Sequence, residues 1–182
     1  LARVPESPVP RAIKVGRPDV RTTAEVIAPW LPNHLPLRVR PYEVNCRYKD
    51  SGVDGKRFNT VFPPENRRVY RDIAYPWSAS GRVRGAPRPG GLPGKGGTGP
   101  LVGPRHVLTA SHVAFNPDGS PKIARFHPAY YNGESPFESA SVVKIWCYEI
   151  VVRPTKATEF LDYAVLILDS PVGKTCGWMG TR

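Results

Sequence analysis

Proline is the residue that most limits how this chain can fold. The sequence contains 22 prolines and 17 glycines among 182 residues, and its proline share of about 12% is more than twice the ~5% of an average protein. A proline inside a helix removes a hydrogen bond and clashes with the preceding turn. Because proline or glycine interrupts almost every stretch of a dozen residues, the sequence excludes long helices.

Residues 1–66 form a proline-rich extension for which we predict little structure of its own. Ten of the prolines lie in this segment, and no alternating run is long enough to predict a strand. Such a segment buries too little apolar surface to offset its loss of conformational entropy. A few apolar side chains could nevertheless dock on a neighbouring domain: Val26, Ile27, Trp30, Leu31, Leu35 and Leu37.

The junction between the extension and the rest of the chain is basic. Arg67, Arg68 and Arg71 resemble a site at which a precursor protein is processed, and the extension is then a propeptide. The alternative is that these arginines form an exposed basic turn.

Residues 67–182 have the pattern of an all-β domain. Short apolar runs separated by turn residues are typical of antiparallel strands. The last predicted strand is wholly apolar, which predicts burial on both of its faces. Gly103-Pro104-Arg105 predicts a hairpin turn, and residues 110–114 can form one helical turn. Many short strands without a long helix indicate a small barrel or sandwich. The predicted strands cover residues 77–84, 98–102, 106–109, 122–127, 141–152 and 163–168.

The charge of the chain does not predict a nucleic-acid or membrane partner. The net charge is +11, but it is spread out: residues 1–66 hold 11 basic and 7 acidic side chains (+4), and residues 67–182 hold 15 and 8 (+7). No run of five like charges and no RNA- or DNA-binding signature is present. No stretch of roughly 18 apolar residues could span a bilayer. The chain starts at Leu1 without a targeting pattern, so we expect it to be processed or incomplete.

We predict no cofactor and no metal. The glycine-rich residues 90–96 lack the spacing of a phosphate-binding loop, because Pro89 stands where its first glycine belongs and Gly96 where it needs serine or threonine. His34, His106 and His127 show no metal-ligand spacing with one another or with cysteines.

The most informative stretch is residues 97–113, which reads GTGPLVGPRHVLTASHV. A buried strand containing Val107 and Leu108 leads into the small residues Thr109-Ala110-Ser111, which permit a tight turn that presents His112. A general base needs this rigid placement, because it must reach both a nucleophile and an orienting carboxylate. His112 is therefore the candidate base.

A candidate carboxylate follows 50 residues later. Asp162 directly precedes the apolar strand of residues 163–168, where it could accept a hydrogen bond from the histidine Nδ1 and fix its tautomer. Asp169 is the competing carboxylate. It stands at the far end of the same strand, before Ser170-Pro171, and we expect it to cap a turn instead.

Together these two motifs resemble the catalytic histidine and aspartate segments of trypsin- and chymotrypsin-like serine proteases. Residues 67–83 and 176–180 resemble the start and the end of the first barrel in the glutamyl-endopeptidase-like branch, so the resemblance covers residues 67–182. It implies an antiparallel six-stranded β-barrel, the N-terminal barrel of that fold. It also implies a secreted, extracellular endopeptidase acting on protein or peptide substrates, with His112 as general base and Asp162 as its orienter. Its working pH is one at which the imidazole is neutral.

The sequence departs from this family in one large respect, since it holds no serine in a Gly-Asp-Ser-Gly-Gly-like loop. Only Ser170 follows Asp162, and Ser111 is too close along the chain to His112 to face it. We therefore expect a chain that stops before the second barrel and is inactive alone, because no acyl-enzyme forms without a nucleophile. The rival interpretation is a non-catalytic, protease-derived binding module.

The three cysteines leave their pairing open. Cys147 and Cys176 could form a disulfide only if their Cα atoms approach within about 7 Å, and Cys46 is then left over. The alternative is three unpaired thiols, with Cys147 buried in its strand.

Overall fold

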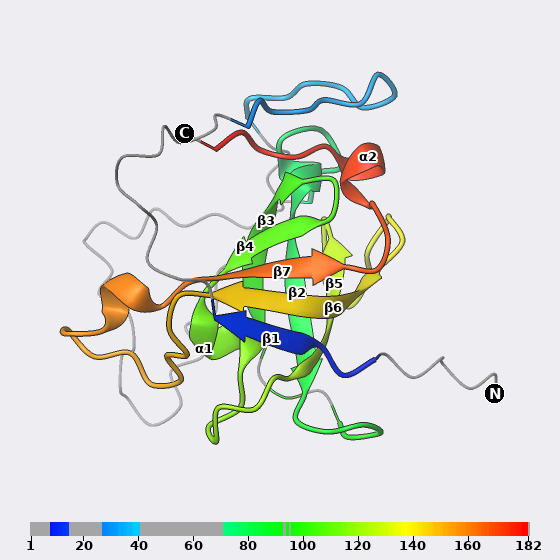
Figure 1. Ribbon diagram of the computed structural model, residues 1–182. Coiled ribbons are helices and arrows are strands. Elements are labelled where there is room, and N and C mark those ends of the chain that lie inside the picture. Colours follow the sequence, from blue (N-terminus) through cyan, green and yellow to red (C-terminus); the bar gives the residue numbers. More distant parts are fainter. Residues whose placement is uncertain (1–7, 15–26, 41–70, 93, 95, 182) are drawn as a thin grey trace, which may run out of the picture.

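The computed structural model describes residues 8–14, 27–40, 71–92, 94 and 96–181. Six antiparallel strands close into a barrel in the order β6–β5–β2–β3–β4–β7, and β7 pairs back with β6 (Figure 1). The barrel strands are β2 (Ser80–Ala86), β3 (Gly97–Gly103), β4 (His106–Thr109), β5 (Ile123–Pro128), β6 (Ala140–Cys147) and β7 (Ala164–Leu168). This closed barrel confirms the predicted all-β fold class.

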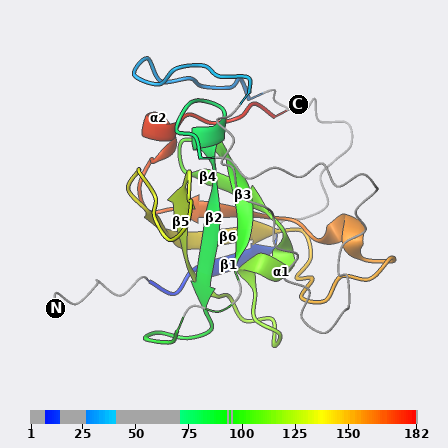
Figure 2. The same ribbon diagram turned by 180° about the vertical axis from the view of Figure 1, so that it is seen from behind.

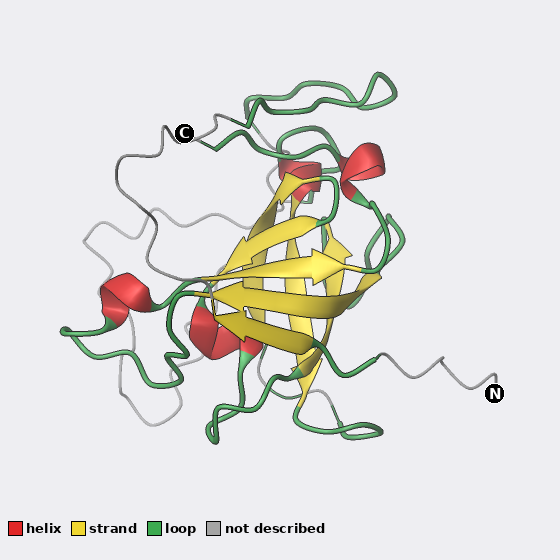
Figure 3. Ribbon diagram, in the orientation of Figure 1, coloured by secondary structure: helices red, strands yellow, loops and turns green. Residues whose placement is uncertain are grey.

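In the part of the chain that the structure describes, helical structure is limited to single turns, as the proline and glycine content predicts (Figure 3). These turns are η2 (Trp77–Ala79), α1 (Ser111–Ala114), η3 (Glu159–Leu161) and α2 (Gly173–Cys176). The predicted hairpin around Gly103-Pro104-Arg105 and the predicted turn of helix after it are both present. None of the helices in the described ranges is long and apolar enough to cross a bilayer.

Two predicted strands are shorter than expected, and a side chain binds the backbone near the end of each. The first strand was expected from residue 77, but Ser80 begins it, since residues 77–79 form η2. There the Ser78 hydroxyl donates to the Cys176 carbonyl at 2.6 Å. The long strand expected over residues 141–152 ends at Cys147. Four residues further on, the Val151 amide donates to the Ser111 hydroxyl at 3.0 Å.

Strand β7 is buried on one face only, so the prediction that both of its faces are buried was wrong. Ala164, Leu166 and Leu168 point into the core, whereas Val165 and Ile167 are partly exposed on the outside of the barrel. In a small closed barrel every strand alternates between interior and exterior. The apolar outer positions are therefore compatible with a strand that has only one buried face.

The core fills the interior of the barrel with aliphatic and aromatic side chains from all six strands. Close packing requires glycine at position 81 of β2, because a Cβ there would lie 2.5 Å from the ring of Phe126 on β5. The largest fully buried side chains are Phe115, Phe126, Leu101, Ile145, Leu166, Leu168, Val83, Val107 and Val142.

The described part of residues 1–66 is more ordered than the sequence predicted. Residues Arg11–Lys14 form β1, which pairs in parallel with residues 144–147 of β6. Strand β5 leaves β6 after Ser141, so β1 occupies the part of the β6 edge that β5 does not cover (Figure 1). A strand of four residues with no local hydrophobic pattern is specified by this pairing rather than by its own sequence.

A second stretch of the extension, residues 27–38, lies against the barrel and is called the docked segment below. Ile27 and Trp30 exchange backbone hydrogen bonds of 3.0–3.1 Å with Thr181 and Trp178, and the two indole rings stack with centroids 5.6 Å apart. In Figures 1 and 2 this segment runs beside the C-terminal residues at the top of the barrel. Of the apolar side chains that could dock, Leu35 is buried and Trp30 stacks on Trp178, whereas Ile27, Leu31 and Leu37 are exposed. Val26 lies outside the described residues. Arg67 and Arg68, the centre of the predicted processing site, lie outside the described residues.

Cys147 and Cys176 are both buried and both free. Of the two pairings left open above, the structure therefore shows unpaired thiols at these positions, while Cys46 lies outside the described residues. Burial raises the pKa of the Cys176 thiol to about 12 and also raises that of Cys147. Both thiols are thus held in the protonated form at neutral pH.

Candidate active site

The segment that carries His112 is held in place by contacts of the residues on either side of the histidine. Strand β4 ends at Thr109, whose hydroxyl donates to the Thr98 carbonyl on β3 at 2.8 Å. The chain then enters α1, in which His112 is the second residue. Val113 packs directly against Gly97 of β3, where any Cβ would collide with the valine. The glycine-rich strand therefore lets α1 lie close to the barrel.

The pairing of β4 with β7 brings the candidate carboxylate to the same place. Thr109 at the end of β4 is opposite Ala164 at the start of β7. In an antiparallel pair, the residues just after one strand lie beside those just before the other. His112 follows Thr109 by three residues and Asp162 precedes Ala164 by two. The register of these two strands thus joins residues that are 50 positions apart in the sequence.

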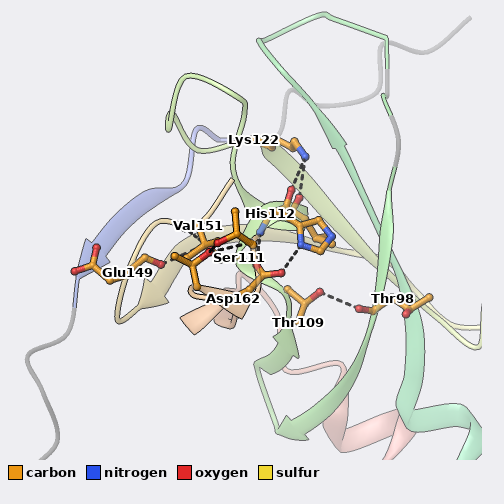
Figure 4. A network of polar contacts seen from close by, with 11 residues as sticks. Thr98, Thr109, Ser111, His112, Lys122, Glu149, Val151 and Asp162 are labelled. Atoms are coloured by element: carbon orange, nitrogen blue, oxygen red, sulfur yellow. Dashed lines mark hydrogen bonds and ion pairs between the residues drawn. The ribbon is translucent and has the colours of Figure 1, made fainter. Parts of the chain in front are cut away.

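Asp162 holds His112 through both of its carboxylate oxygens (Figure 4). Oδ2 lies 2.6 Å from Nδ1 of the imidazole, and Oδ1 accepts the backbone amide of His112 at 2.9 Å. The Asp162 side chain is 9% exposed, whereas the His112 side chain is 45% exposed. A carboxylate is acceptor-only, so the neutral imidazole carries its proton on Nδ1 and leaves the Nε2 lone pair as an acceptor.

Ser111 is buried and its hydroxyl is committed to the loop after β6. The hydroxyl accepts the Val151 amide at 3.0 Å and donates to the Glu149 carbonyl at 3.4 Å. Figure 4 shows Ser111 directed to this loop and not to the imidazole. Ser111 therefore links α1 to the loop after β6. As predicted from the sequence, its hydroxyl does not face the imidazole of His112 and is not placed to act as the nucleophile.

Lys122 contacts the backbone of the site, although nothing in the sequence pattern singles it out. A four-residue helix leaves most of its carbonyls without an internal partner. The Lys122 ammonium donates to the carbonyls of His112 and Val113, both at 3.2 Å, and its own amide donates to the Ala114 carbonyl at 2.9 Å. Gly85 on β2 leaves room for the aliphatic stem. Desolvation by burial lowers the pKa of Lys122.

Asp169, the rival carboxylate, lies at the opposite end of β7, where it forms hydrogen bonds with the backbone of β6. Its backbone amide donates to the Ser141 carbonyl at 2.9 Å, and its side chain accepts the Ser141 amide at 3.0 Å. This arrangement closes the β6–β7 ladder where its register shifts. The structure thus brings Asp162, and not Asp169, to His112.

Within the described ranges, no three side chains of His, Cys, Asp or Glu are grouped closely enough to hold a metal ion. The contacts described above form a site with an oriented, accessible imidazole and a shielded carboxylate. An imidazole held in this way can take a proton from a neighbouring hydroxyl and return it to a leaving group.

Comparison with known proteins finds structural likeness but no sequence match. No family model and no curated protein matches the chain. A structure of Glu endopeptidase in complex with MPD has a TM-score of 0.48 at 19% identity and covers 58% of this chain. The protease Anisep from Arthrobacter nicotinovorans has a TM-score of 0.46 at 18% identity and covers 57% of this chain. The thermostable serine protease AL20 from an extremophilic microorganism has a TM-score of 0.44 at 20% identity and covers 55% of this chain. The match spans about half of each of those chains, 46%, 48% and 48% respectively.

Proposed function

We propose that this chain supplies the base and the orienting carboxylate of a serine-type endopeptidase. One observation carries the proposal: Asp162 binds the Nδ1 and the backbone amide of His112 with separate oxygens, and the imidazole remains exposed. Two bonds from one carboxylate fix the position and the tautomer of the ring. A histidine used only for packing needs neither feature.

In the proposed reaction, His112 is first a general base and then a general acid. Nε2 takes the proton of a serine hydroxyl as its oxygen attacks the carbonyl carbon of the substrate, and Asp162 stabilises the imidazolium that forms. The same proton then passes to the departing amine as the peptide bond breaks, which leaves an acyl-enzyme for water to hydrolyse. Activity falls in acid, because a protonated imidazole cannot accept the serine proton.

The nucleophile and the oxyanion hole are proposed to come from polypeptide that is not included in residues 1–182. Of the two serines near the motifs, the Ser111 hydroxyl is engaged by the loop at residues 149–151, and Ser170 lies at the far end of β7 from His112. We accordingly expect the 182-residue chain to be inactive alone. Protein or peptide substrates and an extracellular location follow from the family resemblance of the two motifs.

The test is covalent labelling of the complete protein with a fluorophosphonate probe, combined with hydrolysis of casein. His112→Ala is expected to abolish both, because the serine loses its base. The matched control is His34→Ala, which removes an exposed histidine of the docked segment and is expected to leave both unchanged. Undiminished labelling of the His112→Ala protein would contradict the assignment of the base.

The rival function, a protease-derived binding module, makes a different prediction about the transcript. A coding sequence that continues past Arg182 into a Gly-Asp-Ser-Gly-like loop supports the enzyme. A stop codon at that point supports the binding module, because Nε2 of His112 then has no serine hydroxyl from which to take a proton.

A further inference from the structure

The outer face of β2 and β5 carries a cluster of cations that the proposed protease reaction does not use. Arg82 and Arg84 on β2 alternate with core residues and point outward. In the register of the two strands, Arg82 is opposite His127 and Arg84 is opposite Arg125. Directly opposed residues of neighbouring strands present their side chains on the same face. Arg82, Arg84 and Arg125, which we call the cationic cluster, thus lie together with His127 on one face of the sheet, where β2 and β5 run side by side (Figure 2).

No carboxylate among the described residues forms an ion pair with the cationic cluster. In the part of the chain that the structure describes, neither Arg82, Arg84, Arg125 nor His127 forms an ion pair. Like charges directly opposed across two strands destabilise a sheet. The protein also has a net charge of +11, which adds to the repulsion. A fold retains such an arrangement at the expense of its own stability, as is common where a surface binds a ligand.

Neighbouring groups hold Arg82, Arg125 and His127 in place. The Arg82 guanidinium lies over the Tyr130 ring at 5.3 Å, and the same ring meets the His127 imidazole edge-on at 5.9 Å. Arg125 donates to the hydroxyl of Ser139 at 2.9 Å. Cations whose side chains are already fixed lose less conformational entropy when a ligand binds.

A separate property of His127 shows how positive this patch is. Burial is the largest cause that lowers its pKa, and Arg125, Arg84 and Arg82 lower it further. Burial first, and then the three arginines that face the imidazole, one on its own strand and two on β2, all disfavour its protonated form.

We propose that the cationic cluster is a binding site for a tetrahedral oxyanion, the sulfate or phosphate ester group of a ligand. Outward residues of one strand are about 7 Å apart, and opposed residues of two strands about 5 Å. A single tetrahedral oxyanion fits a cell of this size and can meet two guanidinium groups at once. Arginine suits such groups, because its planar fork donates two parallel hydrogen bonds to an oxyanion.

The proposal is tested with the full chain and inorganic sulfate, measured against sodium chloride at the same ionic strength. Sulfate is expected to raise the Tm and to saturate, and sodium chloride is not. Arg84→Gln is expected to weaken sulfate binding about tenfold, since it removes a charged hydrogen-bonding partner. In sulfate-free buffer the same substitution is expected to raise the Tm by roughly 1–2 °C, because it relieves repulsion.

Arg125→Gln is a second variant from the same opposed pair, and it is expected to weaken binding as well. Arg153→Gln removes an exposed arginine in the loop before η3 and should leave both the Tm and the binding unchanged. Inorganic phosphate forms the second arm, and the ratio of the two midpoints distinguishes a phosphate from a sulfate ester. Equal effects of sodium chloride, or wild-type binding by Arg84→Gln, would overturn the proposal.

Discussion

The docked segment and the candidate active site are both assembled from residues far apart in the sequence, but by different means. The docked segment is attached mainly by main-chain bonds: four backbone hydrogen bonds join Ile27 and Trp30 to Thr181 and Trp178. The active site depends on one carboxylate and one imidazole. Backbone ladders tolerate many side chains, whereas the site tolerates almost none. The two regions should therefore respond to substitution in opposite ways, one through stability and one through activity.

An ion pair strengthens the docked segment where it meets the start of the barrel domain. Arg38 donates to both oxygens of Asp72 at 2.8 and 2.9 Å. The Asp72 side chain is fully buried and also accepts the Ala74 amide at 2.8 Å. The indole of Trp77 donates to the Arg38 carbonyl at 2.8 Å. This corner is where side-chain chemistry, in addition to the backbone, decides how firmly the segment is held.

The largest expected effect is on activity and comes from Asp162→Asn in the complete protein. The amide can no longer hold the imidazole in the tautomer with a proton on Nδ1, and the equivalent change in serine protease triads lowers kcat about 10⁴-fold. The Tm should fall by only about 2–4 °C. Steady-state kinetics and thermal melting measure the two quantities, and Asp118→Asn in an exposed loop is the matched control. A large loss of Tm would place the role of Asp162 in stability.

The converse expectation concerns Arg38→Met, which keeps the aliphatic stem but removes the charge. Asp72 then remains buried without its bidentate partner, and the free energy of unfolding should fall by about 2–3 kcal/mol. The His112–Asp162 contact lies at the other end of the barrel and should persist. Urea denaturation gives the stability, and the downfield NMR signal of the His112 Nδ1 proton reports the contact. Arg153→Met is the control, and loss of the NMR signal in Arg38→Met would show that the two regions are coupled.

Alkaline pH should weaken the region around the docked segment through Cys176. Burial raises the pKa of this thiol from 9.0 to about 12, so the unfolded chain loses its proton first as the pH rises. The stabilisation is complete below pH 9 and is lost progressively toward pH 12, at a rate that approaches 1.4 kcal/mol per pH unit. Urea denaturation under reducing conditions should show this slope in the wild type and a shallower one in Cys176→Ala. Equal slopes would contradict the expectation.

The smallest expected effect belongs to Lys122, a positioning residue that touches only the backbone of α1. Lys122→Met removes the ammonium from the carbonyls of His112 and Val113, which should lower kcat about fivefold to tenfold without changing KM. Lys122→Arg should restore part of the activity, because it returns a cationic donor. Lys174→Met, at an exposed position of α2, is the control. An increase in KM alone would assign Lys122 to substrate binding instead.

The sequence predicts the parts of this protein whose signals are local. The hairpin of β3 and β4 is predicted because Gly-Pro-Arg marks a turn between two apolar runs, and α1 because small residues follow the strand. Asp162 is found because an acidic residue stands directly before an apolar strand. Each of these features lies within about a dozen residues, where turn chemistry and hydrophobic periodicity determine the conformation.

The pairing of distant segments is not visible in the sequence. Strand β1 and the docked segment bind through backbone groups that every residue except proline carries, so no side-chain pattern announces them. The hydrogen bonds of Ser111 and Lys122 also leave no pattern in the sequence, because each joins a side chain to backbone groups elsewhere in the fold. The sequence spacing of Cys147 and Cys176 is compatible with either a disulfide or two free thiols, and only the tertiary structure shows that the thiols are free.

The sequence by itself therefore determined which residues can carry chemistry, namely His112 and Asp162, because imidazole and carboxylate groups are specified by residue type. The tertiary structure decided that the two meet, since the register of β4 against β7 is set by how the whole barrel closes. It also decided what surrounds them, because burial and main-chain partners exist only after distant strands have paired.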